Sequence, residues 1–229
     1  MTKNNNSGKE TVEFFEDLDK RNLNSEKFIE RYSKQIGIAL GVILLGILGY
    51  FAYDQFVLGP KNEEATTEFL AAQKNLSQGK EDIALGGKSA ANPGFIGTYN
   101  EYSGTKVGKL AAYNAAVLEF KKGNFQKAYD MMDNFSSSNK ILMALKYGVM
   151  GDCLANLNKG DDALSQFEKA VSSSDDDYTS YYFTRKAGLL SLSLKKNDAA
   201  KKYFSSIDEK YKDYDNGASD AYIEMVKYY

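Results

Sequence analysis

The sequence predicts an all-α protein in which one membrane-spanning helix is followed by a solenoid of repeated helix pairs. Three observations predict this fold class: a long uncharged apolar run near the N-terminus, helical periodicity without useful strand-like alternation in the rest of the chain, and internal similarity at a spacing of 35 to 37 residues. Units of this size bury their apolar faces by stacking on their neighbours.

The composition excludes several classes of active site. The 229 residues include no His and one Cys, and the formal net charge is −2. The chain therefore has no His-based acid–base or nucleophile pair, no intrachain disulfide and no Cys-based zinc site. Phosphate loops, dinucleotide fingerprints and nucleophile elbows are also missing from the sequence. We predict no catalytic, cofactor-binding or metal-binding residue and no nucleic-acid partner, and we expect Cys153 to be a buried apolar side chain.

The apolar run covers residues 35–53, QIGIALGVILLGILGYFAY, and contains no charged side chain. As a helix it would be about 28 Å long, close to the hydrocarbon thickness of about 30 Å. The alternatives are a buried core helix and a cleaved signal peptide. The run is apolar on all sides, and the segment before it is too long and too acidic for a signal peptide. We predict a retained transmembrane helix over residues 35–57, surrounded by membrane lipid.

The flanking charges predict the orientation of this helix. Five basic residues lie within 15 residues before it, whereas a similar stretch after it contains only Lys61 and Lys74. The positive-inside rule therefore places residues 1–34 in the cytoplasm and the larger C-terminal domain across the membrane. Residues 9–33 mix apolar and charged side chains, which suits either amphipathic helices at the membrane surface or a solvated spacer.

Small residues within the apolar run could let a second membrane helix approach closely. Glycine is also common in membrane helices that have no such partner, so both interpretations stay open. The candidates for helix packing in the membrane are Gly37, Gly41, Gly46 and Gly49.

Residues 58–104 predict a helix pair with a long flexible loop, which could form a degenerate repeat. We expect Gly59-Pro60 to end the membrane helix and Asn62 to cap the next helix, which runs to about residue 77. Residues 77–94 are rich in Gly, Ser and Asn and predict the loop, and a short helix is expected over 94–102. The apolar face of the first helix of the pair carries Ala65, Phe69, Ala72 and Leu76.

Three segments, residues 110–135, 145–170 and 182–207, align with one another. Two aligned columns hold small residues and are expected where two antiparallel helices of one unit cross, and a third column holds large residues expected to pack against the next unit. The predicted repeats cover about 109–140, 144–177 and 181–214 within a domain of residues 105–216, and residues 217–229 predict a capping helix. The three columns are Ala116, Gly151 and Gly188; Ala128, Ala163 and Ala200; and Met132, Phe167 and Phe204.

The second unit resembles a tetratricopeptide repeat most closely. No unit has the Trp of that family, and no Pro closes the repeats. A helical domain without repeats is the alternative. The residues of the second unit that stand at the family's signature positions are Gly151, Leu154, Ala163, Phe167 and Ala170.

Stacked helix pairs curve, and their first helices line the concave face. A mixture of aromatic, apolar and few charged groups on that face suits a peptide segment, although any of these residues could instead pack between repeats. The groove candidates are Tyr113, Val117, Phe120, Asp152, Asn156, Tyr182, Arg185, Leu189 and Leu192.

The overall layout resembles the YfgM-type ancillary proteins of bacterial Sec translocons, and residues 94–128 are similar to the start of the repeat domain in the Bacteroidota versions. The resemblance implies a single-pass inner-membrane protein with a periplasmic domain. It further implies association with Sec translocon subunits and a membrane-anchored periplasmic prolyl isomerase of the PpiD type, and a role in chaperoning unfolded exported proteins. The alternatives are a scaffold for another envelope machine, such as cell-wall synthesis, division or a secretion apparatus, and an enzyme whose active site the sequence does not reveal.

Overall fold

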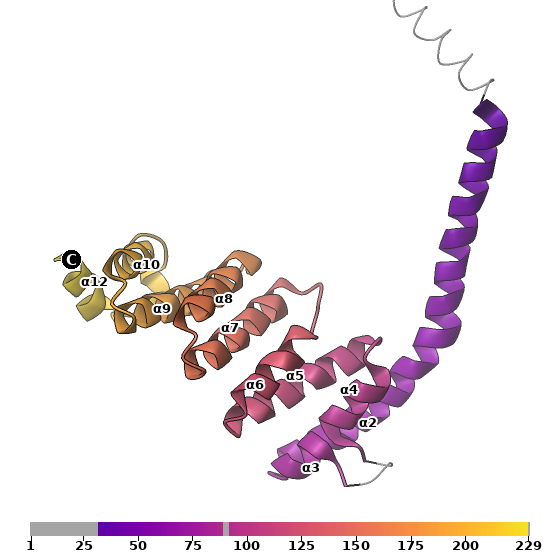
Figure 1. Ribbon diagram of the computed structural model, residues 1–229, viewed down its shortest axis with the longest axis horizontal. Helices are drawn as coiled ribbons and strands as arrows, with labels where there is room; N and C mark the ends of the chain where they lie inside the picture. The colour runs from indigo at the N-terminus through magenta and orange to yellow at the C-terminus, as the bar shows by residue number, and fades with distance from the viewer. Residues whose placement is uncertain (1–31, 89–91, 229) are drawn as a thin grey trace, which may run out of the picture. The chain divides into compact units, whose positions relative to one another are not determined.

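The computed structural model describes residues 32–88 and 92–228. The chain divides into two compact units, Met1–Val57 and Leu58–Tyr229. The described part of the first unit is a helix over residues 32–53, followed by the π-helical segment η1, Asp54–Leu58, whose last residue begins the second unit. The second unit contains helices α2 to α12, and the described residues of the chain contain no β-strand (Figure 1).

The helix of the first unit exposes apolar side chains along its length. Within the described residues one helix, Tyr32–Ser77, is long and apolar enough to cross a membrane, and its most apolar stretch has a mean hydropathy of 2.2 and is 0% buried. Leu45 is 69% exposed and Phe51 is 64% exposed. Exposed apolar surface of this kind is unfavourable in water and suits a lipid environment. By length and composition, this helix is a candidate membrane span.

Contrary to the sequence prediction, the chain does not leave the helix at Gly59-Pro60. The segment η1 is followed directly by α2, Gly59–Ser77, with Pro60 in its first turn. A Pro is tolerated in a first turn, where its missing N–H would have no helical partner, and a wider π turn often stands at such interruptions. Asn62 therefore lies inside the helix and does not cap it, and its backbone oxygen accepts a 2.6 Å hydrogen bond from the Thr66 hydroxyl.

The predicted flexible loop over residues 77–94 instead contains a short helix, α3, Glu81–Gly86. Ala84 and Leu85 of α3 are 0% and 6% exposed and belong to the core cluster around Phe69 and Phe95. The polar composition of the loop hid these apolar residues, whose burial holds the helix in place. Gly87 ends α3 with a φ of 69°, where a Cβ atom would lie 2.1 Å from the backbone oxygen of Asn92.

The N-terminal part of the second unit is built by α2, α3, α4 (Gly94–Tyr102) and the start of the first repeat. The rings of Phe69 in α2 and Phe95 in α4 lie 5.4 Å apart and pack on Ala111 and Ala115. This shared core joins the N-terminal helices to the repeats.

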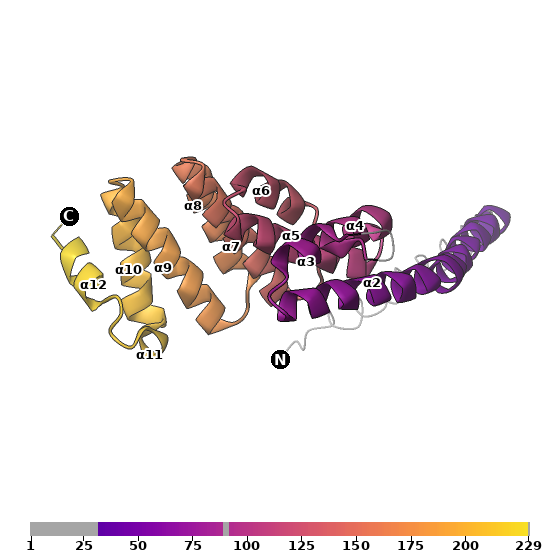
Figure 2. The ribbon, with the colours of Figure 1, turned by 90° about the horizontal axis from the view of Figure 1, so that it is seen from below.

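Three helix pairs follow, and two short helices, α11 (Lys212–Asp215) and α12 (Asp220–Val226), end the chain. In Figures 1 and 2 these helices follow one another in the order of the chain, and each helix of the pairs packs against the next. The all-α solenoid expected from the sequence is confirmed. The pairs are α5 (Lys106–Lys121) with α6 (Phe125–Asp133), α7 (Lys140–Asn156) with α8 (Gly160–Ser173), and α9 (Asp177–Ser193) with α10 (Asn197–Lys210).

The aligned columns of the three repeats are all buried. A Cβ atom on Gly151 would lie 2.6 Å from the Phe167 ring, and one on Gly188 would lie 3.0 Å from the Phe204 ring. The large side chain thus packs directly on the small residue of its own repeat, because both residues lie where the two helices of a pair face each other. It also packs against the next unit, as the sequence analysis expected, because the Phe167 ring lies 6.4 Å from that of Phe183 and the Phe204 ring lies 5.3 Å from that of Tyr222.

Candidate partner-binding surfaces

The groove candidates on α5 are half-buried and pack against neighbouring helices. Tyr113 and Val117 contact the buried cluster that contains Phe135, and the rings of Tyr113 and Phe135 lie 5.3 Å apart. The ring of Phe120 lies 5.3 Å from that of Phe125 on α6. These three side chains therefore hold helices together, and each offers only part of its surface to a partner.

An ion pair joins α7 to α9 on the face formed by the first helices of the repeats, which we call the first-helix face. The Lys186 ammonium lies 2.6 Å from both carboxylate oxygens of Asp152, and both side chains are about 30% exposed. The same ammonium lies 5.2 Å from the ring centre of Tyr182. Asn156 is exposed and donates to the backbone oxygen of Asp152 in its own helix. This arrangement presents a paired charge beside an aromatic ring, a surface suited to polar contacts with a peptide.

The remaining candidates on α9 are engaged within the domain. Leu189 and Leu192 pack against the buried cluster that contains Phe204 and Val226. Arg185 reaches the backbone oxygen of Ala218 at 3.4 Å. The C-terminal segment therefore takes part of the surface that the sequence analysis assigned to a partner.

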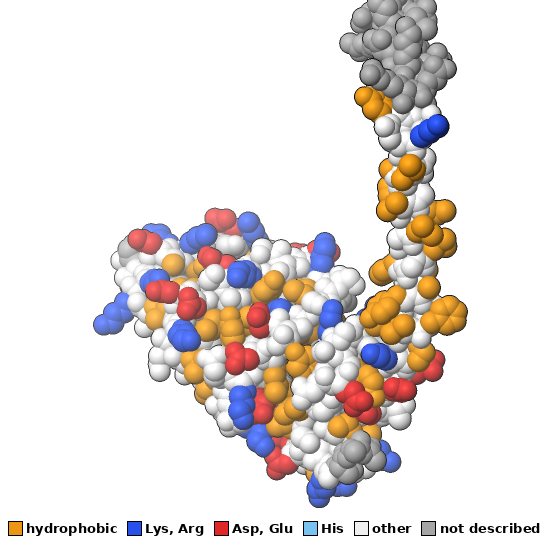
Figure 3. Space-filling view, turned by 45° about the vertical axis from the view of Figure 1, so that its right-hand side comes forward, with side chains coloured by type: hydrophobic (Ala, Val, Ile, Leu, Met, Phe, Trp, Pro, Cys, Tyr) orange, Lys and Arg blue, Asp and Glu red, His pale blue; other side chains and the backbone are white. Residues whose placement is uncertain are grey.

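Tyr182 is one of several tyrosines exposed near the C-terminus. Tyr178 is 58% exposed, Tyr182 is 44% exposed and Tyr214 is 40% exposed. The rings of Tyr178 and Tyr214 lie 6.4 Å apart in an edge-on arrangement. Tyrosine is enriched at protein interfaces because its ring packs while its hydroxyl hydrogen-bonds. Figure 3 shows that hydrophobic and charged side chains also alternate over one face of the repeat domain.

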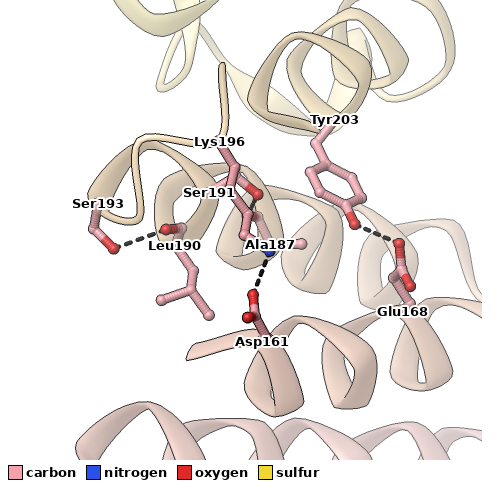
Figure 4. A network of polar contacts seen from close by, with 8 residues as sticks. All are labelled: Asp161, Glu168, Ala187, Leu190, Ser191, Ser193, Lys196 and Tyr203. Atoms are coloured by element: carbon pink, nitrogen blue, oxygen red, sulfur yellow. Dashed lines mark hydrogen bonds and ion pairs between the residues drawn. The ribbon is translucent and has the colours of Figure 1, made fainter. Parts of the chain in front are cut away.

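Polar contacts between neighbouring repeats recur at the repeat spacing. Three pairs join residues 35 positions apart, so that equivalent turns and helices of neighbouring repeats face each other. Figure 4 shows two of them, together with the hydroxyls of Ser191 and Ser193, which donate to backbone oxygens of their own helix. Burial, followed by the hydrogen bond to Glu168, raises the pKa of the Tyr203 phenol. The pairs are Lys140 with Asp175 (3.0 Å), Lys196 with Asp161, and Tyr203 with Glu168 (2.5 Å).

The four glycines proposed for packing in the membrane lie on an uncovered helix. A Cβ atom at any of them would meet no heavy atom within 4 Å. Their surface is therefore open to lipid or to another helix. These residues are Gly37, Gly41, Gly46 and Gly49.

No group of three or more Cys, Asp or Glu residues in the part of the chain that the structure describes could hold a metal ion. Cys153 is 0% exposed, which confirms its predicted place in the core. Burial, followed by the charge of Asp152, raises the pKa of the Cys153 thiol to about 12. The thiol is therefore protonated and shielded at neutral pH, which disfavours nucleophilic chemistry there.

The family described as a tetratricopeptide repeat-like domain matches residues 26–225. The chain belongs to this family. The crystal structure of the MamA protein resembles this tetratricopeptide repeat-like chain with a TM-score of 0.53 and 15% sequence identity, covering 72% of this chain and 81% of MamA. No curated protein matches the sequence. Tetratricopeptide repeat-like domains generally act as non-catalytic scaffolds for protein–protein interaction.

Two features of this tetratricopeptide repeat-like domain were not among the predicted site residues. Lys186 pairs with Asp152 across 34 positions, about one repeat length, so opposite charges at that spacing were the signal available in the sequence. The contact between Tyr178 and Tyr214 joins α9 to α11, and α11 was not predicted. Because α11 was not predicted, the contact that its Tyr214 makes with Tyr178 could not be predicted either.

Proposed function

We propose that the protein is a membrane-anchored scaffold that binds other proteins, and that it serves as an ancillary subunit of the Sec translocon in the bacterial inner membrane. The observation that carries the proposal is a single chain with an exposed apolar helix, 0% buried over its most apolar stretch, and a tetratricopeptide repeat-like domain. The proposed orientation places the N-terminus in the cytoplasm and the repeats in the periplasm, in accord with the basic residues before the helix.

In this proposal the anchor and the repeats have separate tasks. The membrane helix confines the domain to a thin layer at the membrane surface. This raises the effective concentration of the domain toward partners in the same membrane, so weak contacts suffice without any new chemistry. The first-helix face, with the Asp152–Lys186 pair beside Tyr182, offers polar and aromatic contacts to segments of exported proteins. Weak, reversible binding of this kind suits the holding and transfer of unfolded chains.

The translocon assignment rests on the resemblance of residues 94–128 and of the layout to YfgM-type proteins. The same resemblance suggests translocon subunits and a PpiD-like isomerase as partners. A scaffold for cell-wall synthesis, division or secretion would use the same repeat surface, so the partner must be identified directly.

The test is a pull-down of the tagged full-length protein from its native membranes in a mild detergent, followed by mass spectrometry. We expect translocon subunits and a membrane-anchored prolyl isomerase to co-purify. The matched control replaces residues 35–57 with an unrelated membrane helix and keeps the repeat domain. Loss of the partners from this control would assign the contact to the membrane helix, and their retention would assign it to the repeats. Recovery of a different envelope complex without translocon subunits would overturn the proposal.

A further inference from the structure

A pocket of about 450 Å³ lies where α5 and α7 begin, beside the segment that joins α6 to α7. It adjoins the first-helix face at the start of α5 and α7, and none of its lining residues is among the groove candidates. Its floor is apolar, formed by Leu110, Phe135 and Leu142, and its remaining walls are Lys106, Lys109 and serines 136–138. The volume falls within the range of about 300–1,000 Å³ of small-ligand pockets, so it can take one or two side chains and the backbone between them.

The chain segments around this pocket are basic. Residues 103–110 and 134–143 contain three lysines and no Asp or Glu. Lys140 pairs with Asp175, whereas no ion pair involves Lys106 or Lys109 among residues 32–88 and 92–228. Two ammonium groups thus stand at an apolar floor without an internal counter-charge, which favours an anionic ligand.

A third ammonium group stands behind the floor. The Lys146 side chain is 8% exposed and donates 2.8 Å hydrogen bonds to the backbone oxygens of Asp133 and Phe135. Burial lowers the pKa of Lys146, and the charge of Asp133 opposes this effect. These two hydrogen bonds fix the start of the serine segment, so the floor is formed before any ligand arrives.

The helix ends add to the positive field of the pocket. The Thr105 hydroxyl accepts from the backbone N–H of Gly108 at the start of α5, and the Asn139 side chain accepts from that of Leu142 at the start of α7. Each cap satisfies one of the free N–H groups of its first turn and leaves others available. Two helix dipoles therefore direct their positive ends to the same place.

We propose that this pocket binds a peptide segment in which an aromatic or aliphatic side chain stands next to Asp or Glu. The apolar side chain packs on Leu110, Phe135 and Leu142, and the carboxylate lies between Lys106 and Lys109. The serine hydroxyls hydrogen-bond the peptide backbone. A simple inorganic anion would use the lysines but leave the apolar floor uncovered, and for this reason the pocket favours a peptide. The proposal depends neither on a membrane anchor nor on the translocon.

The test measures fluorescence anisotropy of labelled peptides with the purified full-length protein in mild detergent. The probe peptide contains Leu-Phe-Asp-Glu between Gly-Ser flanks. Two matched peptides replace Asp-Glu with Lys-Lys or Leu-Phe with Ser-Ser. We expect the probe to bind about tenfold more tightly than either matched peptide, and its affinity to fall as salt is added. Equal binding of all three peptides, or no binding of the probe, would overturn the proposal.

The variant Lys106→Glu/Lys109→Glu is expected to weaken probe binding by about tenfold or more. Its melting temperature should be unchanged or higher, because acidic residues in a first turn interact favourably with the helix dipole. The matched control, Lys127→Glu/Lys159→Glu, makes the same charge change at the starts of α6 and α8 and should keep the wild-type affinity. An equal loss in both variants would show that net charge alone governs binding. Displacement of the probe by inorganic phosphate at matched ionic strength would also overturn the proposal, because it would show a plain anion site.

Discussion

Gly123, Asn158 and Lys195 occupy the same position in the three repeats, just after the first helix of each pair. Their φ angles are 81°, 59° and 58°, in the left-handed region. The cost of this conformation is low for Gly, intermediate for Asn and higher for a residue with a long side chain. Lys195 is exposed, and none of the ion pairs found within the described ranges involves it, so no ion pair offsets its backbone cost.

Replacement of this lysine should therefore stabilise the domain. We expect Lys195→Gly to raise the free energy of unfolding by about 0.5–1.5 kcal/mol, measured by urea denaturation of the full-length protein in detergent. The reciprocal change, Gly123→Lys, should lower it by a similar amount, although a Cβ at Gly123 meets no atom within 4 Å. A lower stability of Lys195→Gly would mean that the lysine side chain makes a contribution not visible in its contacts.

Single residues of the candidate groove were harder to predict than turns. The sequence analysis assigned Tyr113 and Leu189 correctly to first helices, because the helical period determines the face. It could not tell which neighbour would cover that face. Gly148 is an example of a first-helix residue that the next repeat covers, because a Cβ atom there would lie 2.0 Å from the Phe183 ring of that repeat. Contacts between repeats depend on the stacking geometry, which the period alone does not supply.

At the scale of the elements, the two helices of a pair pack closely where they cross, and the repeats use two different combinations of side chains at that crossing. The second and third repeats place a Phe ring on a Gly, as in the pairs Gly151–Phe167 and Gly188–Phe204. The first repeat has Ala116 and Met132 in one buried cluster. A flexible Met side chain can bend around the added methyl group of Ala, which a rigid ring cannot do.

This difference predicts a coupled pair of substitutions. Met132→Phe alone should overpack the crossing and destabilise the domain by about 1–3 kcal/mol. Adding Ala116→Gly should recover part of that loss, even though Gly in a helix costs about 1 kcal/mol by itself. The measurement is a double-mutant cycle from thermal or urea unfolding. Additive effects in the cycle would show that the two residues do not share one crossing.

The long, periodic helices could be predicted from the sequence, and the short elements could not. The end of α2 at Ser77 and the buried face around Phe69 follow directly from the apolar spacing. By contrast, α3 and α11 contain six and four residues, too few to show a period. Their stability comes from contacts made by distant parts of the chain, and local sequence does not carry that information.

The C-terminal helices depend on a buried carboxylate. Asp215 is 4% exposed, and its oxygens accept from the backbone N–H of Ser219 at 2.8 Å and from the Ser219 hydroxyl at 2.6 Å. Burial alone would raise the pKa of Asp215, but the hydrogen bonds from Ser219, with contributions from Tyr181 and Arg185, outweigh burial and lower it. The charged carboxylate therefore stabilises the fold.

The sign of the pH effect follows from this lowered pKa. The charged Asp215 carboxylate contributes to the free energy of unfolding in full above the ordinary carboxyl pKa of about 3.9. This contribution is lost as the pH falls through the lower pKa that Asp215 has in the folded protein. We expect Asp215→Asn to lower the melting temperature at pH 6, and we expect the difference from wild type to shrink below about pH 4. If the difference in melting temperature stayed constant over this range, the charge of Asp215 would not stabilise the C-terminal helices.

At the scale of the whole molecule, the repeat spacing is found both in the buried columns of the core and in polar pairs on the surface. The buried columns recur every 35 to 37 residues, and polar pairs such as Tyr203–Glu168 join residues 35 positions apart. A solenoid couples each repeat only to its neighbours, so contacts repeat whenever the sequence repeats. The solenoid could therefore be predicted, whereas the surface that a partner uses carries no such repetition and requires direct experiment.

The single cysteine provides a direct test of the proposed membrane orientation. Cys153 is buried, with its pKa raised to about 12, so the native thiol should not react with a maleimide that cannot cross membranes. Ser205, exposed on α10, and Asn5, before the apolar run, are suitable positions for a new cysteine. In intact spheroplasts we expect Ser205→Cys to be labelled, Asn5→Cys to be labelled only after permeabilisation, and the wild type to be unlabelled in both conditions. Labelling of Asn5→Cys but not Ser205→Cys in intact spheroplasts would reverse the orientation, and labelling of neither would place both residues in the cytoplasm and refute a membrane span.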